Sequence, residues 1–345
     1  VMPLTEEHKK LLQAVSPELE FFHAGSDQVD QEELEKAEII VGNLPPKRIR
    51  EAKNLQLLQL NSAGTDGYLE EGVLPEQAHL CNATGAYGLA ISEHMLGMLL
   101  MLIKKLNVYQ INQRNHQWKD EGKVTSVYGS RTLIVGMGDI GSEFGRKVHA
   151  LGGTVVGVRR HKAAVPEFAE AVYTMDELDE QLAKADIVAC SLPGTKETFH
   201  LFNEERIGRM KKGAILINVG RGSLIDEAAL VHALKSGQLS GACLDVTEQE
   251  PLPEDSPLWD APNLILTPHV SGHFHLEETR NRIVRIAAEN IRTLLEGGEF
   301  CSEVDSGDRK RKESVTVPPV KWLQGKRKWR KKHYFLILTA HCSVK

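Results

Sequence analysis

Three short segments contain residue types that could act on a small organic acid. They are Asn218-Val-Gly-Arg-Gly-Ser223, Asp245-Val-Thr-Glu-Gln-Glu-Pro251 and Thr267-Pro-His-Val-Ser-Gly272. Arg221 presents a planar cation that matches a carboxylate, and its charge would stabilise negative charge developing on a carbonyl oxygen. His269 can donate or accept a proton near neutral pH, and a carboxylate such as Glu250 favours its charged form and fixes its ring. Each residue alone is more often structural, so their joint placement decides the prediction.

A glycine-rich turn adds a second kind of chemistry, the binding of a phosphate-bearing cofactor. The motif Gly136-x-Gly138-x-x-Gly141 follows the apolar run 132–135 and opens a segment with helical spacing of apolar residues. The first glycine permits a tight turn, the second lets a pyrophosphate approach the backbone, and the third allows the helix to pack on the strand. Free amides and the positive end of the helix dipole then face the phosphates. The predicted dinucleotide loop, against the alternative of a plain turn, comprises Gly136, Gly138, Asp139, Ile140 and Gly141.

The residues after the next predicted strand indicate which dinucleotide binds. In an NAD site an acidic residue about 20 residues beyond the glycines usually binds the ribose hydroxyls. Arg159 and Arg160 fill that position here. A guanidinium can bind a 2′-phosphate through charge-assisted hydrogen bonds, whereas a carboxylate would repel it. The sequence therefore favours NADP(H), with NAD(H) as a second possibility, and the open alternative is that both arginines only solvate a loop.

Alternating strand-like and helical patterns surround these residues. The candidate strands are 131–135, 154–158, 186–192, 214–219, 241–246 and 264–267, with candidate helices at 203–212 and 226–236 between them. Such alternation is typical of a parallel sheet covered on both faces, and ligands bind such sheets at the carboxyl ends of the strands. A smaller alternation precedes it, with strands at 38–41, 55–60 and 79–82. The sequence thus predicts an α/β fold of two Rossmann-like or flavodoxin-like domains, each a doubly wound parallel sheet, with a cleft between them.

Two long amphipathic segments, 92–106 and 279–295, flank the six-strand unit and suggest that the first domain is completed after the second. The predicted division is a substrate domain over residues 1–104, a dinucleotide domain over 105–272 and a returning part of the substrate domain over 273–307. After about Gly307 the alternation ends, and Pro318-Pro319 and Lys/Arg clusters are typical of an extended, solvated tail. Residues 308–345 are therefore predicted to be disordered or atypical.

With these motifs in place, residues 61–296 resemble the D-isomer specific 2-hydroxyacid dehydrogenase family, and most of all its NADP-dependent glyoxylate/hydroxypyruvate reductase branch. The glycine loop, the Asn-Val-Gly-Arg-Gly segment, the Glu-Pro segment and Thr-Pro-His resemble the family's motifs in order and spacing. The resemblance implies that Arg221 holds the substrate carboxylate and C2 oxygen, that His269 is the acid/base and that Glu250 is its partner. It also implies a substrate loop whose amides near Ala63 and Gly64 meet the carboxylate, with an ordinary glycine turn as the alternative. Further cofactor contacts that it implies are Leu192, Pro193, Val219, Gly220, Asp245 and Gly272.

The resemblance further implies hydride transfer between NAD(P) and a small 2-oxoacid or D-2-hydroxyacid, such as glyoxylate or hydroxypyruvate, by a homodimer built through the cofactor domain. Glu250 argues against formate oxidation, because family members that oxidise formate pair their histidine with Gln. The alternative is a dinucleotide-sensing scaffold, because the C-terminal-binding-protein corepressors resemble the same family and retain its catalytic group. Turnover would separate the two classes.

Composition and charge limit the other classes of function. With 41% hydrophobic and 26% charged residues, the chain is typical of globular proteins. Residues 308–345 hold 12 Lys and Arg against two acids, whereas residues 1–307 hold 30 against 45. Contact with nucleic acid or a membrane is thus expected only through the tail, whose longest apolar run, 334–338, is far too short to span a bilayer. The five cysteines are scattered, which predicts no metal site and a reduced, cytoplasmic setting.

Overall fold

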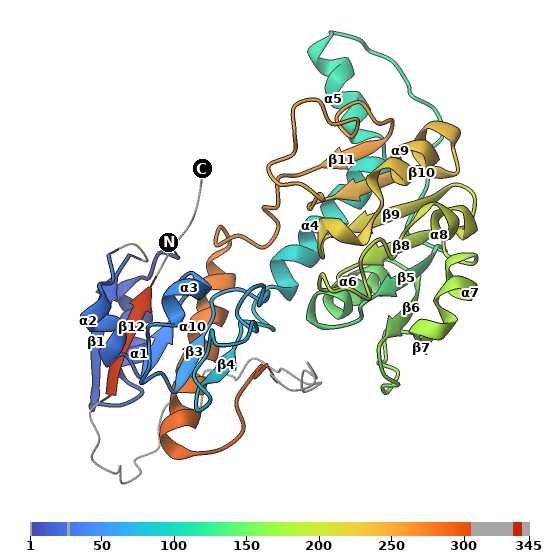
Figure 1. Ribbon diagram of the computed structural model, residues 1–345. Coiled ribbons are helices and arrows are strands. Elements are labelled where there is room, and N and C mark those ends of the chain that lie inside the picture. Colours follow the sequence, from blue (N-terminus) through green and yellow to red (C-terminus); the bar gives the residue numbers. More distant parts are fainter. Residues whose placement is uncertain (1, 26–27, 305–333, 340–345) are drawn as a thin grey trace. The chain divides into compact units, whose positions relative to one another are not determined.

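The computed structural model describes residues 2–25, 28–304 and 334–339, which form two compact units (Figure 1). Unit 1 combines the chain up to Tyr87 with the chain from Phe274 onward, and unit 2 is the continuous stretch Gly88–His273. Each unit is built on one sheet, and all strand pairs in both sheets are parallel. The predicted α/β fold with two parallel sheets is confirmed.

Unit 2 contains a seven-stranded sheet in the order β11-β10-β9-β8-β5-β6-β7. Its strands are β5 (Arg131–Val135), β6 (Thr154–Arg159), β7 (Ala171–Thr174), β8 (Ile187–Cys190), β9 (Ala214–Asn218), β10 (Leu239–Leu244) and β11 (Leu264–Leu266). The direction in which strands are added reverses between β5 and β8, and such a switch point is where open α/β sheets bind ligands at their carboxyl edge. The glycine loop follows β5, so it lies at this point.

Helices cover both faces of this sheet (Figure 1). They are α4 (Gly88–Ile103), α5 (Leu106–Arg114), α6 (Asp139–Ala150), α7 (Leu178–Leu182), α8 (Glu204–Arg209) and α9 (Glu227–Ser236), with 3₁₀ turns η1 (Met175–Glu177) and η2 (Gly222–Leu224). Capping residues fix the helix ends: the Asn203 and Asp226 side chains accept amides of α8 and α9, and Gly237 ends α9 with φ +73°. The apolar strand interiors and the helix faces bury one continuous core, which includes Leu133, Val188 and Leu216.

The boundary predicted after residue 104 is corrected by α4, which belongs to unit 2. This helix packs along α6 and against β10, where Leu102 lies against the backbone of Gly241. At its start, the Gly88 amide donates to the carboxylate of Asp139 at 2.9 Å. Amphipathic spacing shows that a helix has a buried face but not which sheet it covers, so the pattern alone placed α4 in the wrong domain.

Unit 1 contains a five-stranded sheet in the order β1-β12-β2-β3-β4. Its elements are α1 (Glu6–Gln13), β1 (Leu19–Ala24), α2 (Gln31–Lys36), β2 (Ile39–Val41), α3 (Pro46–Ile49), β3 (Leu57–Gln59), β4 (His79–Cys81), α10 (Glu277–Glu296) and β12 (Tyr334–Thr339). On one face, residues of α2 and α3 pack on Ile40, Leu58 and Ile337. The helices α1 and α10 pack on each other.

Strand β12 corrects the expectation that all of 308–345 is an extended, solvated tail. It pairs with β1 on one side and β2 on the other, and Leu336, Ile337 and Leu338 have almost no exposed surface. A parallel strand between two others is buried on both faces, so an apolar run of this length is what the position requires. The remaining predicted tail residues, including the Lys/Arg clusters, lie outside the described residues.

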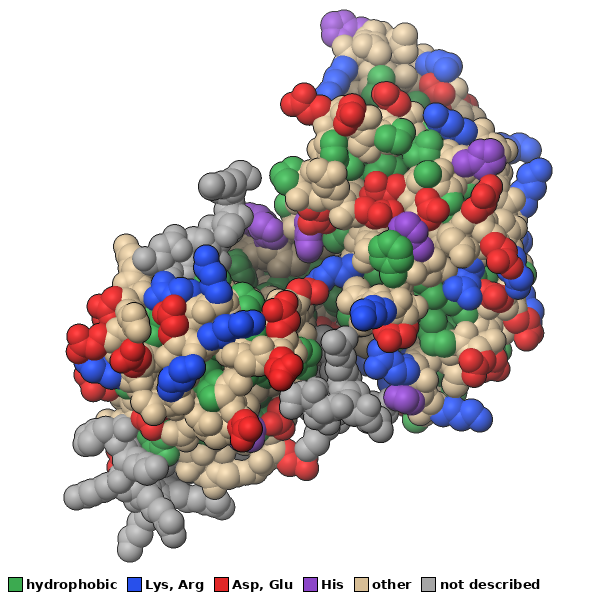
Figure 2. All heavy atoms as spheres, in the orientation of Figure 1, with side chains coloured by type: hydrophobic (Ala, Val, Ile, Leu, Met, Phe, Trp, Pro, Cys, Tyr) green, Lys and Arg blue, Asp and Glu red, His purple; other side chains and the backbone are tan. Residues whose placement is uncertain are grey.

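On the face shown in Figure 2, acidic and basic side chains are interspersed over each unit. Such a surface does not form a field of one sign that would attract nucleic acid. Within residues 2–25, 28–304 and 334–339, no helix has both the length and the apolar character needed to cross a membrane. The same residues contain no cluster of three or more His, Cys, Asp or Glu suited to a metal ion.

Candidate active site

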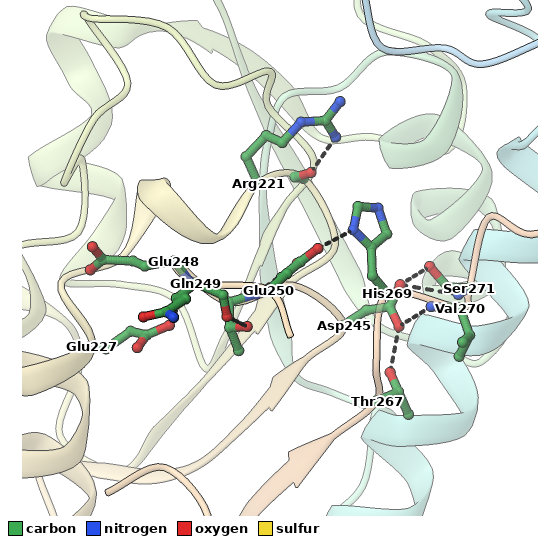
Figure 3. A network of polar contacts seen from close by, with 12 residues as sticks. Arg221, Glu227, Asp245, Glu248, Gln249, Glu250, Thr267, His269, Val270 and Ser271 are labelled. Carbon is green, nitrogen blue, oxygen red and sulfur yellow. Dashed lines mark hydrogen bonds and ion pairs between the residues drawn. The ribbon is translucent and has the colours of Figure 1, made fainter. Parts of the chain in front are cut away.

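The candidate residues of unit 2 follow the carboxyl ends of its strands. Because the strands are parallel, these ends meet at one edge of the sheet. Arg221 follows β9, Glu250 follows β10 and His269 follows β11. Figure 3 shows the three side chains gathered there, with the His269 ring between the Glu250 carboxylate and the side of the site that holds Arg221. The structure therefore brings the three predicted segments together.

The Arg221 segment owes its shape to a buried asparagine and two close backbone approaches. Asn218 is buried, donates from Nδ2 to the Arg221 carbonyl at 2.8 Å and accepts the Gly220 amide at 3.0 Å. A Cβ on Gly220 would lie 2.4 Å from the Leu192 carbonyl oxygen, and one on Gly222 would lie 1.9 Å from the Thr247 carbonyl. The Asn-Val-Gly-Arg-Gly sequence thus fixes the backbone from which the Arg221 side chain projects.

His269 and Glu250 form an accessible pair. Nδ1 of His269 lies 2.8 Å from Oε2 of Glu250, and their side chains are 47% and 39% exposed. An exposed pair of this kind adds little to stability. His269 nevertheless has φ +52°, a left-handed backbone that is costly for a residue with a Cβ. A strained residue carrying an accessible, carboxylate-paired imidazole is typical of a functional site.

The segment that carries His269 is anchored to the carboxylate of Asp245, whose side chain is 1% exposed. Its Oδ1 accepts the Thr267 hydroxyl at 2.6 Å and the Val270 amide at 3.0 Å, and its Oδ2 accepts both the amide and the hydroxyl of Ser271. The Asp245 carbonyl also accepts the His269 amide at 2.8 Å. A carboxylate has about four acceptor positions, and these four donors occupy them. The cofactor contact that the resemblance implies for Asp245 stays a prediction.

The loop that carries Glu250 is held from the other side. The Thr247 amide donates to Oε1 of Glu250 at 3.1 Å, and the Glu248 amide donates to Glu227 at 2.7 Å. The Glu248 carboxylate also lies 2.9 Å from Nε2 of His200. Burial raises the pKa of Glu227 above its ordinary value, and the nearby Glu248 charge adds to this, although the Glu248 amide acts in the opposite direction. The loops that carry His269 and Glu250 are therefore both held in place by hydrogen bonds.

The glycine loop fits a dinucleotide. Gly136 has φ +96°, and a Cβ there would lie 2.9 Å from Leu192, so only glycine makes this turn. A Cβ on Gly141 would lie 2.4 Å from the Gly136 carbonyl oxygen, which is the close helix-strand contact that the motif predicts. A Cβ on Gly138 would meet nothing within 4 Å, and this residue caps α6 without a side-chain hydrogen bond. Space for a phosphate is thus present beside Gly138 at the N-terminus of α6, where the helix dipole favours an anion.

The other predicted cofactor residues lie along the same edge. Arg159 is the last residue of β6, the neighbour of β5, and Arg160 follows it with an exposed side chain. No acidic residue occupies this strand end. The remaining positions follow the ends of β8, β9 and β11, respectively: Leu192 and Pro193, Val219 and Gly220, and Gly272.

The predicted substrate loop lies in unit 1, directly after β3. The Asn43 side chain accepts the Asn61 amide at 2.9 Å, the Ser62 hydroxyl donates to the Gly64 carbonyl at 2.8 Å, and Asn82 donates to the Ala63 carbonyl at 2.9 Å. This network fixes the loop. Two tyrosines support the loop from within: the buried hydroxyl of Tyr87 donates to the Asn61 carbonyl, and that of Tyr68 donates to the Leu44 carbonyl. Burial raises the pKa of Tyr68 to about 12.

Sequence reasoning missed two contributors to this edge. Asn218 was seen only as part of a motif, although a buried amide before two glycines signals a side chain that caps a turn. His94, on α4, was not singled out at all. Its Nε2 lies 3.0 Å from the Thr267 hydroxyl and 3.8 Å from Oδ1 of Asp245. A lone histidine within an apolar helix carries no sequence signal that would separate it from an ordinary buried one.

Comparisons with known proteins agree with this geometry. Residues 96–271 match the model of the family "D-isomer specific 2-hydroxyacid dehydrogenase, NAD binding domain". The chain is 32% identical to a glyoxylate reductase of Thermofilum pendens, over 71% of this chain and 74% of that protein. It is 30% identical to glyoxylate/hydroxypyruvate reductase B of Yersinia pestis, over 76% and 82%. A crystal structure of a D-isomer specific 2-hydroxyacid dehydrogenase from Xanthobacter autotrophicus Py2, in complex with NADPH and MES, is similar with a TM-score of 0.75, 30% identity and coverage of 89% and 96%.

Proposed function

The chain belongs to the D-isomer specific 2-hydroxyacid dehydrogenases, a family of NAD(P)-dependent oxidoreductases, and on that premise we propose that it reduces glyoxylate, hydroxypyruvate or a similar 2-oxoacid with NADPH. The observation that carries the proposal is the imidazole of His269, held 2.8 Å from Glu250 and gathered with Arg221 at one sheet edge (Figure 3). None of the relatives reported above is a corepressor, so the scaffold alternative is not favoured.

In this proposal three side chains divide the work. The guanidinium of Arg221 binds the substrate carboxylate and the C2 oxygen, and its fixed charge stabilises the alkoxide character that develops during reduction. His269 delivers the proton to that oxygen from Nε2, because Nδ1 faces Glu250. Glu250 favours the imidazolium and fixes the ring. A bound nicotinamide supplies the hydride. Ala63 and Gly64 are proposed to contribute backbone amides to the carboxylate.

The preference for NADPH rests on the end of β6. Gly136, Gly138, Asp139, Ile140 and Gly141 are proposed to hold the pyrophosphate through the α6 N-terminus, with Arg159 and Arg160 on the 2′-phosphate. Leu192, Pro193, Val219, Gly220 and Gly272 are proposed to complete the cofactor site. A carboxylate at the β6 end would repel the phosphate, and this chain has two guanidinium groups there instead. The relative from Xanthobacter autotrophicus was crystallised with NADPH.

The test is a steady-state assay of the purified full chain with NADPH and NADH against glyoxylate, hydroxypyruvate and pyruvate. We expect turnover of at least one acid, faster with NADPH. The His269→Ala variant should lose roughly 10²- to 10⁴-fold in kcat, the usual contribution of a general acid. The matched control is His232→Gln, an exposed histidine on α9, which should keep wild-type rates. Absence of turnover with every acid and both cofactors would refute the proposal.

The homodimer and the cytoplasmic location stay predictions. The homodimer can be tested by measuring the molar mass of the full chain in solution. The location requires imaging of the intact protein in cells.

A further inference from the structure

We propose that His94 and Thr267 are positioning residues for His269, acting through a chain of hydrogen bonds that ends on the buried carboxylate of Asp245. These residues all belong to unit 2, and neither His94 nor Thr267 is given a part in catalysis above. The inference deepens the proposed function and rests on it only for its kinetic test.

The hydrogen bonds run in one direction. The carboxylate of Asp245 can only accept, so the Thr267 hydroxyl donates its proton to Oδ1 at 2.6 Å. The same hydroxyl oxygen lies 3.0 Å from Nε2 of His94 and must accept there, which places a proton on Nε2. The direct separation of His94 Nε2 and Asp245 Oδ1 is 3.8 Å, too long for a hydrogen bond. Thr267 is therefore the link between α4 and the carboxylate.

The last member of this series of hydrogen bonds, Asp245, fixes the segment that carries His269. Asp245 binds the amides of Val270 and Ser271 with its side chain and the amide of His269 with its carbonyl, so it holds the residues on both sides of the imidazole. His269 has the costly φ of +52°, and its ring is exposed, so few packing contacts oppose a shift. The orientation of the ring then depends on Asp245 as well as on Glu250. Thr267, supported by His94, holds Oδ1 of Asp245 together with the Val270 amide.

The position of His94 in the fold makes the link rigid. His94 lies near the middle of α4, a helix of 16 residues. Its neighbours Ile91, Met95 and Met98 are buried. A donor on such an element is placed more accurately than one on a loop. Removing it would leave the Thr267 hydroxyl with one partner fewer in a part-buried place, and the segment would relax toward other arrangements.

The kinetic test compares removal of the link with its conservative replacement. His94→Leu and Thr267→Val should each lower kcat by about 10- to 100-fold, the upper value being that of a misplacement of about 1 Å, while the dissociation constant of NADPH changes little. His94→Gln, which restores an Nε2 donor, and Thr267→Ser, which restores a hydroxyl, should recover most of the loss. The double variant His94→Leu/Thr267→Val should be no slower than the worse single variant, because both substitutions interrupt the same series of hydrogen bonds. Fully additive losses, or no rescue by Gln and Ser, would overturn the inference.

A second measurement separates this inference from the proposed function. Hydrogen exchange of a peptide spanning 267–273 reports the amides of Val270 and Ser271, which Asp245 protects, and it needs no substrate. Exchange should accelerate in His94→Leu and Thr267→Val, remain near wild type in His94→Gln and be unaffected by the control His232→Gln. Unchanged exchange in both disrupting variants would refute the positioning role even in an active enzyme. Accelerated exchange in a chain that turns over no 2-oxoacid would support the positioning role and refute the proposed function.

Discussion

Replacement of Ile337 by Ala tests whether the last strand is a working part of unit 1. Ile337 has no exposed surface and packs among residues of α2, α3, β2 and β3. The substitution removes three buried carbon atoms, which at about 0.8 kcal/mol each gives ~2.4 kcal/mol for the transfer from water. The cavity left on the sheet face beneath α2 and α3 raises the expected loss to about 3–4 kcal/mol, within the range for such truncations. That is a large share of the roughly 5–15 kcal/mol by which a domain is stable.

The assay is native-state hydrogen exchange of the full chain, read by mass spectrometry for each unit. Peptides that span β2 and β3 should exchange roughly 10²- to 10³-fold faster in Ile337→Ala, since each 1.4 kcal/mol is a factor of ten. Peptides that span β9 and β10, in unit 2, should not change. The matched control is Glu20→Ala, an exposed side chain on the adjacent β1, with an expected effect within about 0.5 kcal/mol. If β2 and β3 exchange at the wild-type rate in Ile337→Ala, residues 334–339 are a tail and the argument fails.

Three further predictions concern unit 2. Arg221→Lys keeps the charge but loses the planar fork, so kcat/KM for the 2-oxoacid should fall by about 10²-fold in steady-state assays; ordinary kinetics would mean that the carboxylate binds elsewhere. Arg159→Asp combined with Arg160→Ser should lower the ratio of kcat/KM for NADPH to that for NADH by about 10- to 100-fold, the value of a charged hydrogen bond, and an unchanged ratio would exclude both residues from 2′-phosphate recognition. Burial raises the pKa of Glu227 above 4.5 in the fold. The free energy of unfolding therefore falls as the pH rises from 4.5 through the raised pKa, because the buried side chain must then ionise. Glu227→Gln, which keeps an acceptor for the Glu248 amide, should therefore melt at the same or a higher temperature than wild type at pH 8, with no gain below pH 4; a lower melting temperature at pH 8 would contradict the sign.

The sheet of unit 2 could be predicted because its signals are local. Each strand is a short apolar run next to a turn residue, and β5 is found at the predicted residues 131–135. Strands β9 and β10 are shifted or shortened by one or two residues, as expected of boundaries set by hydrogen bonds with neighbouring strands. The candidate site could be predicted for the same reason, because Arg221, Glu250 and His269 follow strand ends whose direction the alternation already fixes.

What could not be predicted depends on contacts between distant parts of the chain. Strand β7 has only half-buried residues and sits at the sheet edge, so it lacks the apolar run by which central strands are recognised. The role proposed for His94 needs α4 to lie beside Thr267, 173 residues later. The saturation of Asp245 likewise arises from four donors that no spacing rule brings together. Motifs identify side chains by type, whereas positioning contacts are set by packing.

Strand β12 lies inside the sheet of unit 1, between β1 and β2. If β12 is counted as the first strand, the order β1-β12-β2-β3-β4 becomes 2-1-3-4-5, the flavodoxin-like order. Met2 and Leu4 line the same small cavity as Leu338 and Thr339 at the end of β12.

This order has a kinetic consequence. Ile40 pairs with Ile337 across almost 300 residues, so this pairing can form only after β12 has been made. The sheet of unit 2 lies within one continuous stretch and meets no such delay. Because long-range pairing slows folding, unit 2 should form first and unit 1 should close last.

The loop after β3, where a 2-oxoacid is proposed to bind, begins at Asn61, whose side chain contacts the Thr339 carbonyl at 3.5 Å. The last strand to join the fold therefore borders the proposed substrate loop, so damage to β12 should impair binding of the acid before it impairs binding of the dinucleotide.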